Sequence, residues 1–348
     1  MTQAIYDSFK QDKENGIIKY DKTLGKGSYG EIREVQINTS CKPMAAKLIT
    51  KESKNKECLD IVKDLRGPNI VKIVQIMSKM IDNKPYSLVI MEKAALRDLG
   101  KLSEFFHNYN LLRTINKPFT DYNNESYTGE NLLRFYVKQI VEGMEILNRY
   151  SLVHFDIKPE NILINNNLAL KLCDFSLLTK VKDSKKLYNI PGGTYGFLSP
   201  EYYKEGKVTK EIAKKQDYFS LGCTILSILY GKPFLNYTKS NSNEFTFNNI
   251  KENINEGKNI VGSNQVIDDL SLNFFKKLID FKPEDRLNFE GIYRSKWINK
   301  NERIINSIYS NNQGDEEKMI MELQKSDFLQ DKIKKTTKRK RILMLKRL

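Results

Sequence analysis

Apolar and polar positions along the first quarter of the chain follow the pattern of β-strands. The segment GEIREVQI sets Ile32, Val35 and Ile37 among charged residues, and the apolar runs PMAAKLIT, VKIVQI and YSLVIME follow it. Such runs, rich in β-branched residues, predict strands. Between PMAAKLIT and VKIVQI the segment KECLDIVKDL is helix-like and ends before Gly67 and Pro68. Residues 16–92 are therefore expected to form a small sheet with one helix.

After about residue 95 the apolar spacing changes to three and four residues. In NLLRFYVKQIVEGMEILNRY, the positions Leu133, Val137, Ile140, Met144 and Leu147 follow this spacing. They form one face of an amphipathic helix. The segment LGCTILSILYG is apolar nearly all round, as in a helix at the centre of a lobe. A mostly helical second lobe is expected.

Three segments lack a clear period. Residues 1–16 contain no apolar run preceded by basic residues, so they do not resemble a secretory signal. Residues 107–129 are rich in Asn, Tyr and Thr and predict a long surface loop or insertion. Residues 299–348 are expected to be a polar linker that leads to a basic C-terminal tail.

Composition narrows the class of protein. The 348 residues are 40% hydrophobic and 29% charged, which suits one large globular domain or two lobes. The longest apolar stretch falls short of the ~20 residues of a membrane-spanning helix. Four scattered cysteines without a C-x-x-C pair, and only two histidines, argue against a zinc site and a disulfide framework. We expect a cytoplasmic protein, with a nuclear location as the alternative.

The net charge of +15 is concentrated at the end of the chain. The last eighteen residues, DKIKKTTKRKRILMLKRL, hold nine basic residues and one acidic residue, which is +8 of the +15. KKTTKRKR resembles a nuclear localisation signal, and KRKRILMLKRL has the pattern of a basic amphipathic helix. A nuclear import factor, calmodulin or an anionic surface (a membrane or nucleic acid) would fit this tail. A solvated charged terminus is the alternative.

Two features in the strand-rich segment suit phosphate binding. LGKGSYGEI contains G-x-G-x-x-G, whose glycines let a backbone approach a phosphate closely, although a plain hairpin has similar glycines. A strand follows it, whereas a Rossmann fold would need a helix there. Lys47 lies in an apolar strand, where it either points outward or meets an anion.

The segment VHFDIKPENILI carries the strongest chemical signal. It places Asp156, Lys158 and Asn161 within six residues, and Asp174 follows in KLCDFS. Carboxylate and amide oxygens beside a lysine suit a hard cation and a polyphosphate. Two polar turns between strands are the alternative.

Taken in order, these motifs resemble a eukaryotic protein kinase domain of the serine/threonine type over residues 17–298. GPNIV, GTYGFLSPE, DYFSLG and PEDRL extend the match. The resemblance implies an α+β fold in two lobes. Residues 17–93 would form an N-lobe of antiparallel sheet with one regulatory helix, and residues 94–298 a mostly helical C-lobe.

The resemblance also implies roles in transfer of the ATP γ-phosphoryl to a Ser or Thr hydroxyl of a protein substrate. Asp156 would accept the hydroxyl proton, and Lys158 would neutralise charge on the transferring group. Asn161 and Asp174 would hold Mg²⁺, and Lys47 would contact the α- and β-phosphates. The positions implied around ATP are Leu24, Gly25, Lys26, Gly27, Ser28, Gly30, Ile32, Ala45, Lys47, Met91, Glu92, Ala94, Asp98 and Leu163. Met91 would lie behind adenine, backbone groups of Glu92 and Ala94 would bond it, and Asp98 would bind ribose.

Four further positions have supporting roles by the same resemblance. Glu201 and Arg286 would form a buried ion pair that ties the activation segment to the C-lobe. Asp217 would brace the backbone of the catalytic loop. Thr194, together with Lys158, matches the pattern of serine/threonine-specific kinases.

The sequence departs from the family pattern at three positions. Phe155 replaces the arginine that receives the activation-loop phosphate, which implies activity independent of phosphorylation there. Ser176 replaces a glycine after Asp174. In the family, a glutamate of the regulatory helix pairs with the strand lysine, here Lys47. The family's spacing places Cys58 at that glutamate position, and Glu57 is its neighbour. Either a local length change lets Glu57 pair with Lys47, or the pair is weak. The last two departures motivate the alternative of a pseudokinase or ATP-binding scaffold.

Overall fold

The computed structural model describes most of the two predicted lobes. The described residues are 2–10, 17–27, 30–38, 40–50, 56–94, 98–101, 119–120, 126–127, 129–165, 169–204, 206–230 and 269–300. Ser28, the linker and basic tail beyond residue 300, and most of the predicted insertion at 107–129 lie outside them. Two short strands, β6 (Phe119–Thr120) and β7 (Ser126–Tyr127), pair within that insertion.

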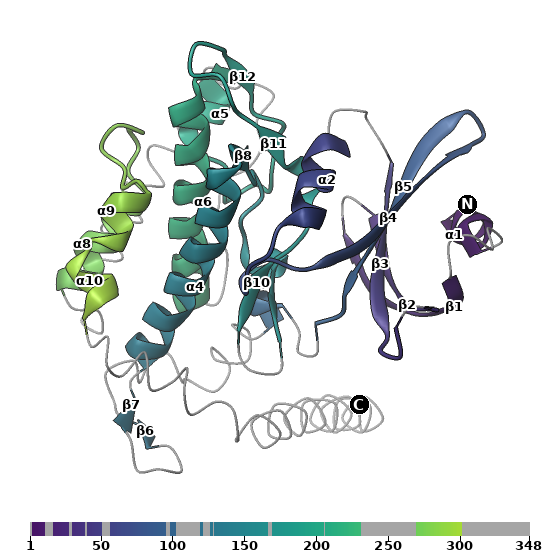
Figure 1. Ribbon diagram of the computed structural model, residues 1–348. Helices are drawn as coiled ribbons and strands as arrows, with labels where there is room; N and C mark the ends of the chain where they lie inside the picture. Colours follow the sequence, from purple (N-terminus) through teal and green to yellow (C-terminus); the bar gives the residue numbers. More distant parts are fainter. Residues whose placement is uncertain are drawn as a thin grey trace, which may run out of the picture.

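The N-lobe is a five-stranded antiparallel sheet with strand order β1-β2-β3-β5-β4 (Figure 1). The strands are β1 (Ile17–Gly27), β2 (Gly30–Ile37), β3 (Met44–Thr50), β4 (Ile73–Ile81) and β5 (Lys84–Glu92). Helix α2 (Lys56–Asp64) lies between this sheet and the helical lobe (Figure 1). Its inward residues Cys58, Leu59 and Val62 share a buried cluster with Ala45 and Val89 of the sheet. The predicted sheet with one helix is confirmed.

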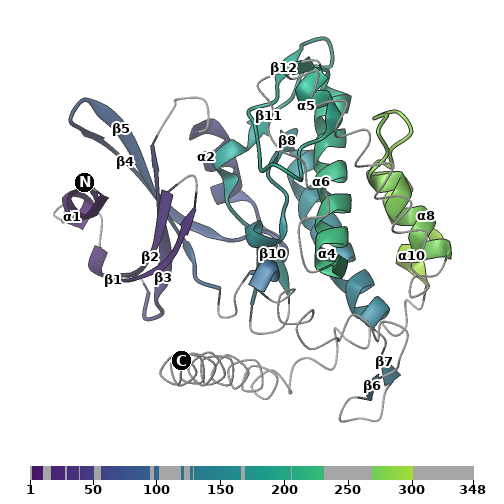
Figure 2. The same ribbon diagram turned by 180° about the vertical axis from the view of Figure 1, so that it is seen from behind.

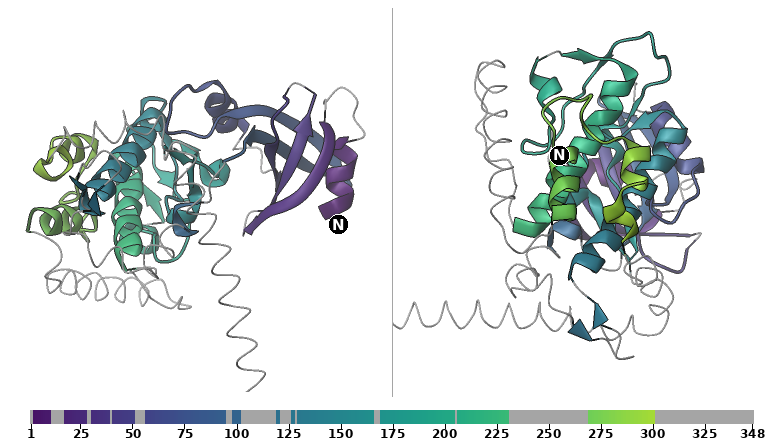
Figure 3. Two further views of the ribbon diagram at one scale, coloured as in Figure 1. Left: turned by 90° about the horizontal axis from the view of Figure 1, so that it is seen from below. Right: turned by 90° about the vertical axis from the view of Figure 1, so that its left-hand side faces the viewer.

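An additional helix, α1 (Thr2–Lys10), covers the other face of the sheet (Figure 3). Ile5, Tyr6 and Phe9 are buried there against Val35 and Leu48. The sequence prediction left residues 1–16 unassigned and missed this helix. The three apolar residues fall on one helical face, at i, i+1 and i+4, which was the available signal.

The C-lobe is mostly helical, as predicted (Figure 2). It contains α4 (Gly129–Arg149), α5 (Pro200–Lys204), α6 (Lys210–Tyr230), α8 (Asp269–Leu278), α9 (Phe289–Tyr293) and α10 (Lys296–Asn299). The apolar segment predicted to be buried forms the second half of α6. A Cβ at Gly222 would lie 2.7 Å from Ile279 Cγ2, so the glycine allows α6 and α8 to pack closely. None of the described helices combines the length and apolarity needed to cross a membrane.

Short strand pairs hold the loops of the C-lobe that carry the motifs. Strand β8 (Leu152–Val153) pairs with β11 (Thr179–Lys180), β9 (Ile162–Ile164) with β10 (Leu170–Leu172), and β12 (Tyr188–Asn189) with β13 (Lys207–Val208). Two 3₁₀ turns, η3 (Pro159–Asn161) and η4 (Phe175–Leu177), follow Asp156 and Asp174, respectively. The loop carrying Asp156 runs from β8 to β9 and the turn carrying Asp174 from β10 to β11, so both segments connect the same two strand pairs.

Candidate active site

Asp217 on α6 fixes the backbone of the loop that carries Asp156. Its two carboxylate oxygens accept the backbone N–H groups of His154 at 2.7 Å and Phe155 at 2.8 Å. Burial raises the pKa of Asp217 to about 6, so the group is mainly ionised at neutral pH. Phe155 has a φ of 65°, an uncommon conformation for a residue with a side chain. The two hydrogen bonds offset that strain and aim the next residue, Asp156.

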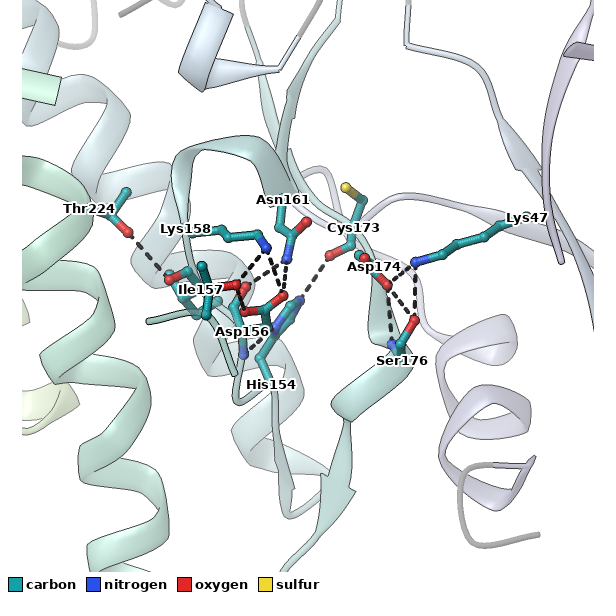
Figure 4. Close-up of polar contacts among 11 residues, drawn as sticks. Lys47, His154, Asp156, Ile157, Lys158, Asn161, Cys173, Asp174, Ser176 and Thr224 are labelled. Carbon is teal, nitrogen blue, oxygen red and sulfur yellow. Dashed lines mark hydrogen bonds and ion pairs between the residues drawn. The ribbon is translucent and has the colours of Figure 1, made fainter. Parts of the chain in front are cut away.

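Asp156 lies at the centre of a hydrogen-bonded network (Figure 4). Its Oδ1 accepts a hydrogen bond from Thr194 Oγ1 at 2.7 Å, and its Oδ2 lies 3.2 Å from Lys158 Nζ. Lys158 also donates to Thr194 Oγ1 at 2.6 Å. The structure thus brings Lys158 and Thr194, which match the serine/threonine-specific pattern, together at Asp156. Thr194, on the activation segment, holds the carboxylate and the ammonium side by side.

Asn161 is oriented by the same carboxylate. Its amide nitrogen donates to the backbone oxygen and to Oδ2 of Asp156, both at 2.8 Å. The amide oxygen is therefore turned away from Asp156, on the side where Asp174 lies (Figure 4). His154 ties the two segments together, because its Nε2 lies 3.0 Å from the backbone oxygen of Cys173.

Asp174 forms an ion pair with the buried Lys47 of β3 (Figure 4). Ser176 completes a triangle, because its Oγ lies 3.1 Å from Lys47 Nζ and 2.5 Å from Asp174 Oδ1. Burial alone would raise the pKa of Asp174, but the Lys47 ammonium and the hydrogen bonds from Lys47 and Ser176 outweigh it and lower that pKa. Asp174 is therefore a carboxylate at neutral pH, able to bind a cation.

Glu57 does not pair with Lys47, so that alternative from the sequence is wrong. The Glu57 side chain is 68% exposed, and its Oε1 lies 2.6 Å from Nζ of Lys180 on β11. The hydrogen bond and charge of Lys180, with a smaller contribution from Lys182, lower the pKa of the Glu57 carboxyl. Cys58 occupies the inward position and is 2% exposed. Glu57 is one residue before this inward position, and one residue of offset in a helix turns its carboxylate ~100° away from the site.

The residues predicted around adenine border the connection between the lobes. Ala45 pairs with Met91 across β3 and β5, and Met91 is buried. The N–H of Glu92 donates to the backbone oxygen of Lys72 at 3.0 Å, and Glu92 pairs with Met44 at the end of the β3–β5 ladder. Asp98 forms a β-bridge with Leu163. Ile32 packs against the same buried cluster, and Ala94 follows the end of β5.

The described glycines of the glycine-rich segment lie where β1 ends and β2 begins. Gly27 pairs with Gly30, and Leu24, Gly25 and Lys26 precede them in β1. Gly30 has a φ of 133°, and a Cβ there would lie 2.5 Å from the backbone oxygen of Leu48. Only glycine fits this position, which explains one glycine of the motif by steric contact.

Glu201 and Arg286 form the predicted buried ion pair. Arg286 Nη2 lies 2.6 Å from Glu201 Oε1, and the two side chains are 0% and 4% exposed, respectively. The pair joins α5, directly after the activation segment, to the loop before α9. Loss of one partner from such a pair leaves a buried charge and costs about 3–5 kcal/mol.

Comparison with known proteins identifies the family. A model of the protein kinase domain matches residues 18–298, and the chain belongs to this family. Its relatives include an Aurora kinase of Eremothecium gossypii, 26% identical over 80% of this chain and 68% of that protein. Serine/threonine-protein kinase 17A of Oryctolagus cuniculus is 27% identical over 80% of this chain and 65% of its own length.

The citron rho-interacting kinase of Rattus norvegicus is 29% identical over 66% of this chain. The match covers only 12% of that protein. The chain therefore spans between about an eighth and two thirds of these relatives. The similarity to these relatives lies in the kinase domain. The roles assigned to individual site residues stay predictions.

Proposed function

We propose that this protein transfers the γ-phosphoryl group of ATP to a Ser or Thr hydroxyl of a protein substrate. The observation that carries the proposal is the pair of polar clusters, Asp156 with Lys158 and Thr194, and Asp174 with Lys47. The first holds a proton acceptor beside an ammonium group. The second pairs a carboxylate with a buried ammonium that suits a phosphate.

In this scheme the chain's own residues position charge. Asp156 orients the substrate hydroxyl and accepts its proton at a carboxylate oxygen, while Lys158 neutralises charge on the transferring group. Lys47 binds phosphate oxygens of the nucleotide. Catalysis rests on positioning and electrostatics, without a covalent enzyme intermediate.

The donor set also suits Mg²⁺. The amide oxygen of Asn161, which is turned away from Asp156, and the ionised carboxylate of Asp174 are hard oxygen ligands from two adjacent segments. We propose that they hold the cation, which would supply charge neutralisation to the polyphosphate when bound. The remaining coordination sites would be filled by phosphate oxygens and water.

We further propose that activity does not depend on phosphorylation of the activation segment. Phe155 is 1% exposed and belongs to a buried cluster with Tyr188, Ile190 and Val208. Tyr188 lies in β12, pairs with Val208, and donates its hydroxyl to the Asp183 backbone oxygen at 3.0 Å. Apolar packing and the β12–β13 pair therefore support the activation segment. In the family pattern, a phosphate bound by the arginine has this role.

Phosphatase treatment of the purified protein should leave kcat within about twofold of the untreated value. The reason is that a folded segment held by apolar contacts gains little from one added charge. The measurement is transfer from labelled ATP to a basic protein substrate, with mass spectrometry to confirm dephosphorylation. Thr194→Ala, which removes the hydroxyl between Asp156 and Lys158, serves as a control that must lower kcat. Loss of activity on dephosphorylation would contradict the proposal.

A second candidate function is a pseudokinase or ATP-binding scaffold. The Glu57–Lys180 pair favours this candidate, because the carboxylate on the regulatory helix binds Lys180 and does not bind Lys47. A scaffold would bind Mg-ADP while transferring no phosphoryl group from labelled ATP to any of several protein substrates. Measurable transfer that depends on Asp156 excludes this candidate.

The basic tail lies outside the described residues, and its partners remain a proposal. We propose a cytoplasmic protein with access to the nucleus through residues 331–348. Deleting these residues should remove nuclear signal in fluorescence microscopy. Unchanged localisation would favour a solvated terminus.

A further inference from the structure

We propose that Ser176 is a positioning residue that holds Lys47 in place of the regulatory-helix glutamate. The inference rests on the proposed kinase function. It starts from the hydroxyl oxygen of Ser176, which lies 3.1 Å from Lys47 Nζ and 2.5 Å from Asp174 Oδ1 (Figure 4). A glycine at this position has no oxygen to offer. The hydroxyl accepts from the ammonium and donates to the carboxylate, so it fixes both partners at once.

The turn that carries Ser176 favours this geometry. Asp174 has a φ of 61° and caps η4, accepting the backbone N–H of Ser176 at 3.4 Å. The Ser176 side chain is thereby directed back toward the carboxylate. Phe175 anchors the turn from its other side, because it is buried and its ring lies edge-on to His154 at 5.6 Å between centroids.

The packing of α2 keeps Glu57 away from Lys47. Cys58, Leu59 and Val62 are each at most 3% exposed and form the helix face that meets the sheet. Turning Glu57 inward requires a rotation of ~100°, which would carry these apolar side chains out of their cluster. The Lys47 side chain, 5% exposed, needs oxygen partners in its place, and Ser176 and Asp174 provide them.

One consequence is that movement of α2 is not coupled to Lys47 through an ion pair. Glu57 instead links α2 to Lys180 on β11, at the start of the activation segment. Lys47, the lysine proposed to bind the nucleotide, contacts Asp174 and Ser176 in the turn after β10. Changes in α2 should therefore affect nucleotide binding less than changes in Ser176.

The test compares Ser176→Ala, Ser176→Gly and Ser176→Thr with Glu57→Ala. Affinity is measured by titration with Mg-ADP, and steady-state kinetics give separate KM values for ATP and for a basic protein substrate. Ser176→Ala and Ser176→Gly should weaken Mg-ADP binding and raise KM for ATP by about tenfold, the lower range for a hydrogen bond to a charged group. KM for the protein substrate should stay within about twofold. Ser176→Thr, which keeps the hydroxyl, and Glu57→Ala should both stay close to the wild type.

Three results would overturn the inference. They are a Ser176→Gly variant with wild-type Mg-ADP affinity, a Glu57→Ala variant as weak as Ser176→Ala, and a Ser176→Thr variant that fails to keep affinity. Thermal unfolding without nucleotide checks that each variant folds. Ser176→Gly is expected to fold, because the family pattern has glycine at this position. If the wild type transfers no phosphoryl group, the proposed function fails, while the Mg-ADP titration still decides the role of Ser176.

Discussion

Asp156→Asn should lower kcat by about 10²–10⁴-fold, the range that a positioned general base contributes. Asparagine keeps the shape of the side chain but cannot accept a proton. Its amide also fits the network poorly, since the oxygens of Asp156 meet donors from Thr194, Asn161 and Lys158. One of those donors would face an NH₂ group. The measurement is transfer from labelled ATP to a basic protein substrate in the presence of Mg²⁺.

Mg-ADP affinity should survive this change, because Lys47 and Asp174 belong to the other cluster. Asp60→Asn provides the matched control, since Asp60 is an exposed aspartate on α2. It carries the same chemical change outside the site and should keep kcat within about twofold. Equal kcat values for Asp156→Asn and the wild type would remove the basis of the proposed catalytic mechanism.

The main elements of the fold could be predicted because their apolar patterns are long and regular. The segment GEIREVQI corresponds to β2 residue for residue, and KECLDIVKDL contains α2. Helix α1 was missed because it is only nine residues long and its register depends on the sheet face that it covers. Short helices are marginal in isolation, so tertiary packing decides whether they form.

The candidate site could be predicted as a set of residues, because Asp156, Lys158 and Asn161 lie on one short loop whose spacing fixes their proximity. The partners of Lys47 could not. The hydrogen bond from Ser176 depends on the turn at Asp174, and the Glu57–Lys180 pair depends on which face of α2 is buried. A one-residue offset in a helix is visible in the sequence, but its consequence depends on contacts more than a hundred residues away.

Phe155→Arg, which introduces the arginine of the family pattern, should destabilise the protein by about 3–5 kcal/mol. Phe155 is buried, and its cluster includes Val153, Val181, Tyr188 and Ile190. A guanidinium group there would lose water without gaining an acidic partner from that cluster. The measurement is the free energy of unfolding from denaturant titration, together with kcat for the folded fraction.

Phe155→Leu is the matched control, because it keeps an apolar side chain with a smaller volume. We expect it to cost about 1–2 kcal/mol and to retain most of the activity, as volume changes between apolar side chains are tolerated better than buried charges. If Phe155→Arg is as stable as the wild type and becomes sensitive to phosphatase, the segment can accept a phosphate after all. The apolar cluster and an arginine–phosphate pair would then be two alternative ways to hold the activation segment. The proposed independence from phosphorylation would then depend on Phe155 alone.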